Sequence, residues 1–232
     1  MSQKKDFGEG PLYTIFNYIW WFFMGNFYFL ICSIPLLLTL IAYKTAVLED
    51  GLLFFMISII FEAPAFTALC STMGKIVREN DANITKDYFK AYKINFLQSL
   101  FLGALQSLFL FILIEDIKIF KITGYSKILL TVFMALILIV MLMDLYIFPI
   151  LSRFYLKTID ILKLSLYCCI KKFKITLLNI SVIIIAAVLL QYLPAVSMFF
   201  VISIVSYLIM FFEKDILKSF EEKIKTDSNS KA

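Results

Sequence analysis

Two carboxyl side chains stand inside otherwise apolar stretches of this sequence. Glu62 lies within Leu52–Met73, and Asp144 lies within Ile128–Ser152. A charge at the centre of a membrane helix costs about 2.5 to 3.5 kcal/mol by translocon insertion, so such residues usually face other helices. Two neighbouring carboxyl groups titrate in separate steps, which would suit proton transfer or aspartyl-type chemistry. Alternatively, they contact an ion or substrate, or each pairs with an Asn, Gln, Ser or freed backbone carbonyl and has a structural or conformational role.

Four amide side chains are further candidates for polar contacts in or beside apolar stretches. They are Asn95, Gln98, Gln106 and Asn179. The first three recur, with Ser99, Gly103 and Ser107, at spacings of three to four that place them on one helical face. Such a face commonly serves close helix packing and interhelical hydrogen bonds. The other interpretation is a face that lines a path for a substrate.

Motifs for enzyme chemistry and cofactor binding do not occur. The chain contains no histidine and no CxxC pair, and it lacks the GxxxxGK[ST], GxSxG, HExxH and GxGxxG patterns. The usual ligand spacings for zinc or haem are therefore missing, as are the motifs for nucleotide binding and hydrolysis. We predict no enzyme activity, no catalytic residue, no metal site and no cofactor. The four cysteines are expected to be free thiols, with Cys32 and Cys70 acting as small apolar fillers.

Composition places the chain among membrane proteins. Of 232 residues, 62% are hydrophobic and 17% are charged, and the mean hydropathy is +0.91. An ordinary soluble domain is about 45 to 50% apolar and about 25% charged. The net charge of +5 lies mainly in loops between apolar stretches, whereas nucleic-acid binding needs a basic face on a folded module. Nucleic acid is therefore not an expected partner, and membrane lipid is.

The hydropathy pattern predicts an all-α, polytopic fold with about six transmembrane helices. One such helix needs about 20 predominantly apolar residues. The expected spans are Asn26–Tyr43, Leu52–Met73, Phe96–Ile114, Ile128–Ser152, Ile175–Leu193 and Ala195–Phe212. We treat residues 1–212 as a single transmembrane domain. Residues 213–232 should form a charged cytoplasmic tail that is partly disordered.

Three prolines lie in the apolar stretches, at Pro35, Pro64 and Pro149. Each should kink its helix, because proline removes a backbone hydrogen bond. Before the first span, the aromatic-rich residues Leu12–Phe23 resemble an interfacial belt and predict a helix lying on the membrane surface. One long tilted helix is the alternative.

Lysine and arginine residues distribute unevenly between alternate loops. All but Lys44, Lys118, Lys121 and Lys127 of the 22 fall on the side that also carries both termini. Cytoplasmic loops are enriched in these residues. Both termini should therefore be cytoplasmic. The six spans satisfy this rule without exception.

Two basic amphipathic segments follow the second and fourth spans on the cytoplasmic side. In the first, Thr85 is expected to cap a short helix, and the second covers Arg153–Lys174. Their basic side chains are Lys86, Lys90, Lys93, Lys163, Lys171 and Lys172. Such residues ordinarily contact anionic lipid. The sharper hypothesis is a docking surface for a cytoplasmic partner. Because the second and fourth spans each carry an acid upstream of a proline, a parallel internal repeat is also conceivable.

Several short motifs follow one another along the chain. They are GPLYTIFNYI with Asn26, SIP at Ser33–Pro35, PAFTAL at Pro64–Leu69, VREND, and YFKAYKINF at Tyr88–Phe96, with Pro149 and Arg153-Phe154 in the second half. Together they resemble the YesL-like family of bacterial membrane proteins. The resemblance implies a six-span protein of the bacterial cytoplasmic membrane, of undefined activity, that is often supposed to accompany carbohydrate uptake by ATP-binding-cassette systems. It implies no catalytic residues.

The resemblance and the intramembrane acids together lead to two functional hypotheses. The first is an auxiliary or permease-like component of a solute uptake system, for which carbohydrate is the expected solute and a cytoplasmic ATPase or other transporter subunits are the expected partners. One departure counts against a typical permease subunit: Glu62-Ala63-Pro64 lies in an apolar stretch and not in an ATPase-docking loop. The alternative is a membrane scaffold or sensory protein with no translocation pathway.

Overall fold

A computed structural model describes residues 11–44, 51–123 and 127–229, and within these ranges the chain is helical with no strand. Its helices are α1 (Pro11–Cys32), α2 (Ile34–Lys44), α3 (Gly51–Glu79), α4 (Ile84–Thr123), α5 (Lys127–Arg153), α6 (Thr158–Lys171), α7 (Phe173–Tyr192) and α8 (Pro194–Asn229). Six helices in the described ranges are long and apolar enough to cross a membrane. The predicted all-α, polytopic class is therefore confirmed.

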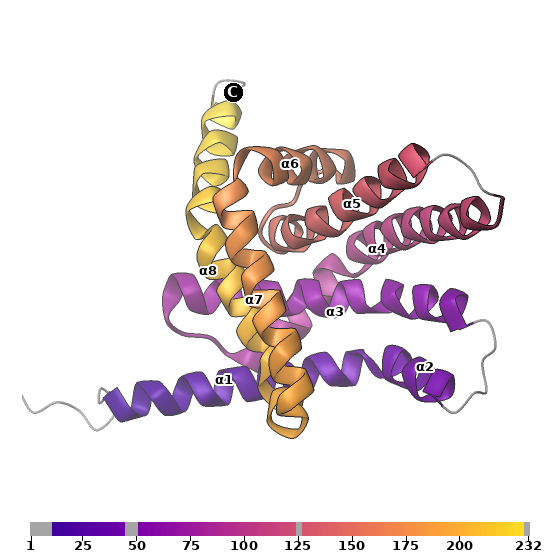
Figure 1. Ribbon diagram of the computed structural model, residues 1–232. Coiled ribbons are helices and arrows are strands. Elements are labelled where there is room, and N and C mark those ends of the chain that lie inside the picture. The colour runs from indigo at the N-terminus through magenta and orange to yellow at the C-terminus, as the bar shows by residue number, and fades with distance from the viewer. Residues whose placement is uncertain (1–10, 45–50, 124–126, 230–232) are drawn as a thin grey trace, which may run out of the picture.

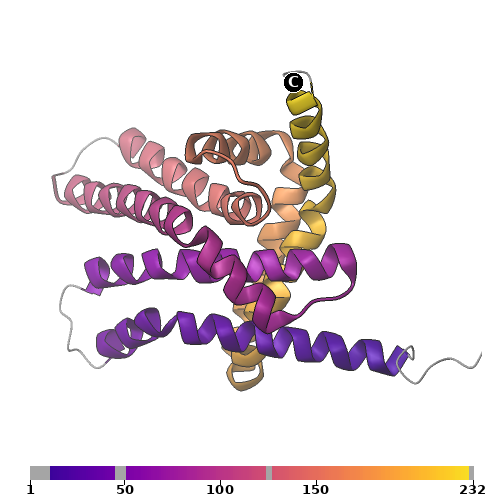
Figure 2. The same cartoon turned by 180° about the vertical axis from the view of Figure 1, so that it is seen from behind.

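Helix α3 is the centre of the fold. It packs against α1, α2, α4, α5 and α8. In Figure 1, α3, α4 and α5 are stacked side by side, and the α1–α2 pair covers the other side of α3. The antiparallel α7–α8 hairpin crosses these helices steeply in both views (Figures 1 and 2). The six long helices therefore do not form a simple parallel bundle.

The first helix differs from the expected interfacial segment. Helix α1 continues without a break from Pro11 to Cys32, and Leu12–Cys32 is itself long and apolar enough to span. The expected break between Phe23 and Asn26 is therefore wrong. The alternative of one long helix is also wrong, because α1 ends at Cys32 and a turn at Ser33 separates it from α2. Pro35 lies in the first turn of α2, two residues after this turn at Ser33. Helical hydrogen bonds from Ser33 to Phe29 and from Leu37 to Ser33 lie on either side of it, so Pro35 marks the junction of α1 and α2.

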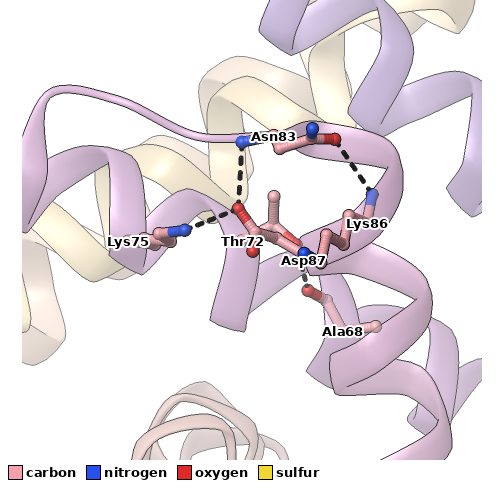
Figure 3. Close-up of polar contacts among 6 residues, drawn as sticks. All are labelled: Ala68, Thr72, Lys75, Asn83, Lys86 and Asp87. Atoms are coloured by element: carbon pink, nitrogen blue, oxygen red, sulfur yellow. Dashed lines mark hydrogen bonds and ion pairs between the residues drawn. The ribbon is translucent and has the colours of Figure 1, made fainter.

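The first amphipathic segment is not a separate helix. It forms the start of α4, which runs for 40 residues through the third span and into the expected loop after it. Asn83 caps the helix and Thr85 does not: Oδ1 of Asn83 accepts from the Lys86 N–H at 3.2 Å. In return, Asp87 Oδ2 accepts from the Asn83 N–H at 3.0 Å and from Lys75 Nζ at 2.8 Å (Figure 3). This cap ties the end of α3 to the start of α4.

The second amphipathic segment does fold separately. It forms α6, and only Lys172 separates α6 from α7. The two halves of the suspected repeat therefore differ at this point, since the corresponding segment of the first half is continuous with its span. Pro64 and Pro149 both lie inside helices, in α3 and α5.

The C-terminal tail continues the sixth span as a helix. Helix α8 extends to Asn229, and Ile216, Leu217 and Phe220 are buried in the same core as the end of α5. These apolar residues recur at helical spacing, so the tail has a face to bury. The described part of the tail therefore differs from the expected disorder. Residues 230–232 lie outside the described ranges.

Candidate functional site

Three of the predicted polar residues meet at one cavity. Glu62 from α3, Gln106 from α4 and Asp144 from α5 line a space of about 210 Å³. The remaining lining is mostly apolar and includes Phe66 and Phe148. Because the three polar side chains come from three helices, only the tertiary structure brings them together.

Gly103 allows the two helices that flank this cavity to approach closely. A Cβ atom at this position would lie 2.7 Å from Cβ of Ala63, closer than real carbon atoms approach. One turn further along α4, the Ser107 hydroxyl donates to the backbone carbonyl of Met56 at 2.8 Å. Gly103 and Ser107, two members of the polar and small face predicted for the third span, therefore serve helix packing.

Glu62 is half-buried, and Ser33 is its one side-chain hydrogen-bond neighbour among the described residues. Its Oε1 lies 2.7 Å from the Ser33 hydroxyl, which also lies 2.8 Å from the carbonyl oxygen of Phe29. Because a hydroxyl has a single proton, Ser33 cannot donate to both oxygens at once. The second carboxyl oxygen, Oε2, is buried and has no hydrogen-bond partner among the described residues.

Asp144 on α5 is also half-buried and lines the same cavity. The buried Gln106 side chain contacts its carboxyl group across the α4–α5 interface. Its Oδ1 is buried, with no hydrogen-bond partner among the residues that the structure describes. Buried polar atoms are nearly always satisfied in proteins, and the exceptions call for an explanation. The cavity thus contains two carboxyl groups and an amide that together can bind a small polar molecule or exchange a proton.

The other predicted amides lie elsewhere. Gln98 donates from Nε2 to the carbonyl of Leu156 at 2.7 Å and so holds the connection between α5 and α6. Asn95 lines a different cavity at the ends of α3 and α5. Asn179 is fully buried between α7 and α8, where it donates to Glu213 at 2.8 Å. The positions of Gln98 and Asn179 favour packing roles, and none of the three amides joins Glu62, Gln106 and Asp144.

Glu213 is a buried carboxyl that the sequence reasoning assigned to the tail. Its side chain is 1% exposed, and its Oε2 has no partner among the described residues. A signal was present: Ile209, Met210, Ile216 and Leu217 flank it at helical spacing, and all four are buried. That apolar face passes through Glu213, whereas a purely polar tail would show no such periodicity.

Asn26 was also missed as an intramembrane polar residue. It is fully buried, donates from Nδ2 to the carbonyl of Met198 at 2.7 Å and accepts the Ser203 N–H at 3.1 Å. Both ends of one amide are thereby bonded to the backbone of α8. Asn26 therefore fastens α1 to the last helix.

The predicted basic residues are exposed on two separate elements. Lys86, Lys90 and Lys93 lie on α4, and Lys163, Lys171 and Lys172 lie on α6 and directly after it. Their exposure leaves them accessible to lipid or to a partner. Of the six, Lys90 also lines the cavity that contains Asn95.

Comparison with known proteins leads to a family of unknown function. The chain matches no curated protein and no solved structure at a significant level. Residues 13–117, from α1 to the last part of α4, match the family described as "Protein of unknown function, DUF624". The match includes Glu62 and Gln106 but not Asp144. The resemblance to the YesL-like membrane proteins is consistent with this family, whose sequence pattern extends over residues 13–117 of the chain.

Proposed function

We propose that this multi-pass membrane protein is a permease-like or auxiliary component of a solute uptake system, and that its solute contacts the cavity between α3, α4 and α5. The observation that supports this is the convergence of Glu62, Gln106 and Asp144 on that cavity. Carboxyl and amide groups inside a membrane are unfavourable unless they form hydrogen bonds or ion pairs, or contact a substrate or ion. Here each carboxyl retains one buried oxygen that has no partner among the described residues.

The size of the cavity favours a small solute. Its volume of about 210 Å³ lies below the roughly 300 to 1,000 Å³ of ordinary ligand pockets. A single sugar unit therefore suits it better than an oligosaccharide, and the hydroxyl groups of that sugar can bond to the two carboxyls and the amide that interrupt the mostly apolar lining. The aromatic rings of Phe66 and Phe148, 5.8 Å apart and edge to face, add an apolar surface for a sugar ring.

The test is uptake of labelled monosaccharides by cells that carry variants of the chain. Glu62→Gln and Asp144→Asn keep size and shape but remove the acid, so we expect each to change the KM or maximal rate of uptake by about tenfold. Glu115→Gln and Asp116→Asn make the same chemical changes at half-buried acids outside the cavity lining. These controls should leave uptake unchanged. Unchanged uptake in all four variants would favour the scaffold or sensory alternative.

The proposed setting is the bacterial cytoplasmic membrane, with both termini cytoplasmic and a cytoplasmic ATPase or other transporter subunits as partners. The exposed lysines of α4 and α6 support this part of the proposal. Light crosslinking in native membranes, followed by affinity purification, should recover an ATPase or a solute-binding protein in fixed proportion. Charge reversal at Lys163, Lys171 and Lys172 should reduce that recovery while membrane insertion is retained. Equal recovery from the variant would count against these lysines as the contact.

A further inference from the structure

A second cavity, more polar than the first, lies at the junction of α3, α4 and α5. It has a volume of about 280 Å³ and is formed by the end of α3, the start of α4 and the residues that close α5. Its polar lining residues include Lys75, Arg78, Asp87, Lys90, Asn95 and Arg153. On the charge-based orientation, this is the cytoplasmic side of the protein.

Positive charge dominates this lining. Four cationic side chains, from Lys75, Arg78, Lys90 and Arg153, face the cavity together with a single carboxylate, that of Asp87. The four cations come from three helices. The charge of Arg153 acts on Arg78, and an anion bound between like charges offsets their repulsion.

Internal ion pairs compensate only part of the charge. Lys75 pairs with Asp87 at 2.8 Å, and Arg153 pairs with Glu221 of α8 at 2.7 Å. Asp87 is also held in the cap of α4, where its Oδ2 accepts from Asn83 (Figure 3). Arg78 and Lys90 form no ion pair within the described ranges. Lys90 therefore remains for an external anion, and so does Arg78, on which the carboxylates of Glu79 and Glu221 act without forming an ion pair.

The backbone provides room for Arg78. A Cβ atom on Gly74 would lie 3.3 Å from Nη1 of Arg78 and would collide with Met210. The guanidinium group therefore folds back over its own helix, where glycine leaves space for it. A guanidinium presents five N–H donors in a planar fork that matches the oxygens of a phosphate group.

We propose that this cavity binds the phosphate group of an anionic ligand, with Arg78 and Lys90 as its charged donors. Lys75 and Arg153 add positive charge while remaining in their own ion pairs, and the Asn95 amide is a neutral donor. The phosphate can belong to the headgroup of an anionic lipid, since basic pockets between membrane helices on the cytoplasmic side suit such groups. It can equally belong to a small soluble phosphate ester. This site is separate from the proposed solute cavity and does not depend on it.

Binding to the purified full-length protein tests the proposal. The probes are dioctanoyl phosphatidylglycerol, dioctanoyl phosphatidylcholine and glycerol 3-phosphate, each titrated in the same detergent and followed by native mass spectrometry. Wild-type protein should bind phosphatidylglycerol, glycerol 3-phosphate or both, in preference to phosphatidylcholine. The double variant Arg78→Gln with Lys90→Gln should weaken that binding by at least about tenfold, because it removes two charge-assisted contacts.

A matched control separates the cavity from general surface charge. Lys86→Gln with Lys93→Gln also removes two positive charges, but from exposed positions on α4 that do not line the cavity. This control should bind as wild type does. Equal weakening in both double variants, or no preference of wild type over phosphatidylcholine, would overturn the proposal. If the first double variant is not monodisperse, Lys90→Gln alone, an exposed position, is compared with Lys93→Gln.

The probes also identify the source of the phosphate. Binding of phosphatidylglycerol with no competition from glycerol 3-phosphate indicates a lipid headgroup site, because the acyl chains then contribute. Equal binding of glycerol 3-phosphate indicates a site for soluble esters. Either result supports a phosphate site, and the loss in the cavity variant is required in both cases.

Discussion

Single buried polar side chains connect elements that lie far apart in the chain. Asn26 bonds α1 to α8 through both ends of its amide, and Asn179 bonds α7 to α8 through Glu213. Inside a membrane protein these contacts matter because lipid offers no replacement partner. Residues of this kind decide how the last two helices dock onto the rest of the molecule.

The Asn26 contact can be tested by its removal. Asn26→Ala should lower the thermal midpoint of the protein in detergent, because two interhelical hydrogen bonds are lost at about 0.6 to 1.7 kcal/mol each. Asn17→Ala is the control, since Asn17 lies half-buried on the same helix and has no side-chain hydrogen bond among the described residues. A midpoint shift of equal size in both variants would contradict the role given to Asn26.

The thiols of α6 should respond to pH in a defined direction. Burial raises the pKa of Cys169 to about 11, with a smaller contribution from Glu213. The thiolate is the reactive form and an ordinary thiol has a pKa near 8.5. Labelling of Cys169 by a maleimide should therefore be slow at pH 7 and rise about tenfold per pH unit up to pH 9. Mass spectrometry of native and denatured protein measures this, and equal rates in both states at pH 7 would contradict it.

At the scale of elements, helix boundaries depend on contacts that short-range patterns do not reveal. Helix α4 starts at a cap whose Asp87 also pairs with Lys75 of α3. Helix α8 extends beyond its span because Ile216, Leu217 and Phe220 find a core. The Arg153–Glu221 ion pair then connects the extension to the end of α5. The tail is therefore part of the folded unit.

Truncation tests whether the tail belongs to the folded unit. A chain that stops after Phe212 loses Ile216, Leu217 and Phe220, whose burial contributes roughly 1.5 to 3 kcal/mol each. We expect this variant to be recovered in lower yield and with a lower thermal midpoint. A chain that stops after Lys223 keeps all three and should resemble the full-length protein. If the two truncations behave alike, residues 213–223 contribute nothing to the fold.

At the scale of the molecule, the six apolar helices do not share one direction. The α7–α8 hairpin crosses α3–α5 steeply in both views (Figures 1 and 2). Membrane helices are usually tilted by about 20° from the bilayer normal. A hairpin that crosses the other helices steeply departs from this arrangement, so whether it spans the membrane needs a direct test. The charge distribution still predicts six crossings, with the break at Leu193 opposite the C-terminus.

Cysteine labelling tests this topology. In a background without the native cysteines, Gln191→Cys should react with a membrane-impermeant maleimide on intact cells, because it lies beside the break. Ser219→Cys, on the extension of α8, should react only after the membrane is permeabilised. Both positions are exposed in the structure. Protection of both cysteines in intact cells would indicate that the hairpin does not cross.

The sequence by itself determined the class of this protein. Apolar stretches of spanning length predict membrane helices without reference to any contact, because each helix satisfies its own backbone hydrogen bonds. The same reasoning singled out Glu62, Gln106 and Asp144, since a polar group in an apolar stretch is unfavourable wherever the helix packs. The break after α1 was misplaced because the aromatic residues resembled an interfacial belt.

Only the tertiary structure decided which polar groups meet. Glu62, Gln106 and Asp144 share a cavity, whereas Asn95, Gln98 and Asn179 do not join them. Burial of Glu213 likewise depends on how α8 packs against α7, and convergence of Arg78, Lys90 and Arg153 depends on how α4 and α5 pack against α3. The physical reason is that periodicity defines the face of a helix on which a residue lies, while the partner of that face is set by packing between segments distant in the sequence.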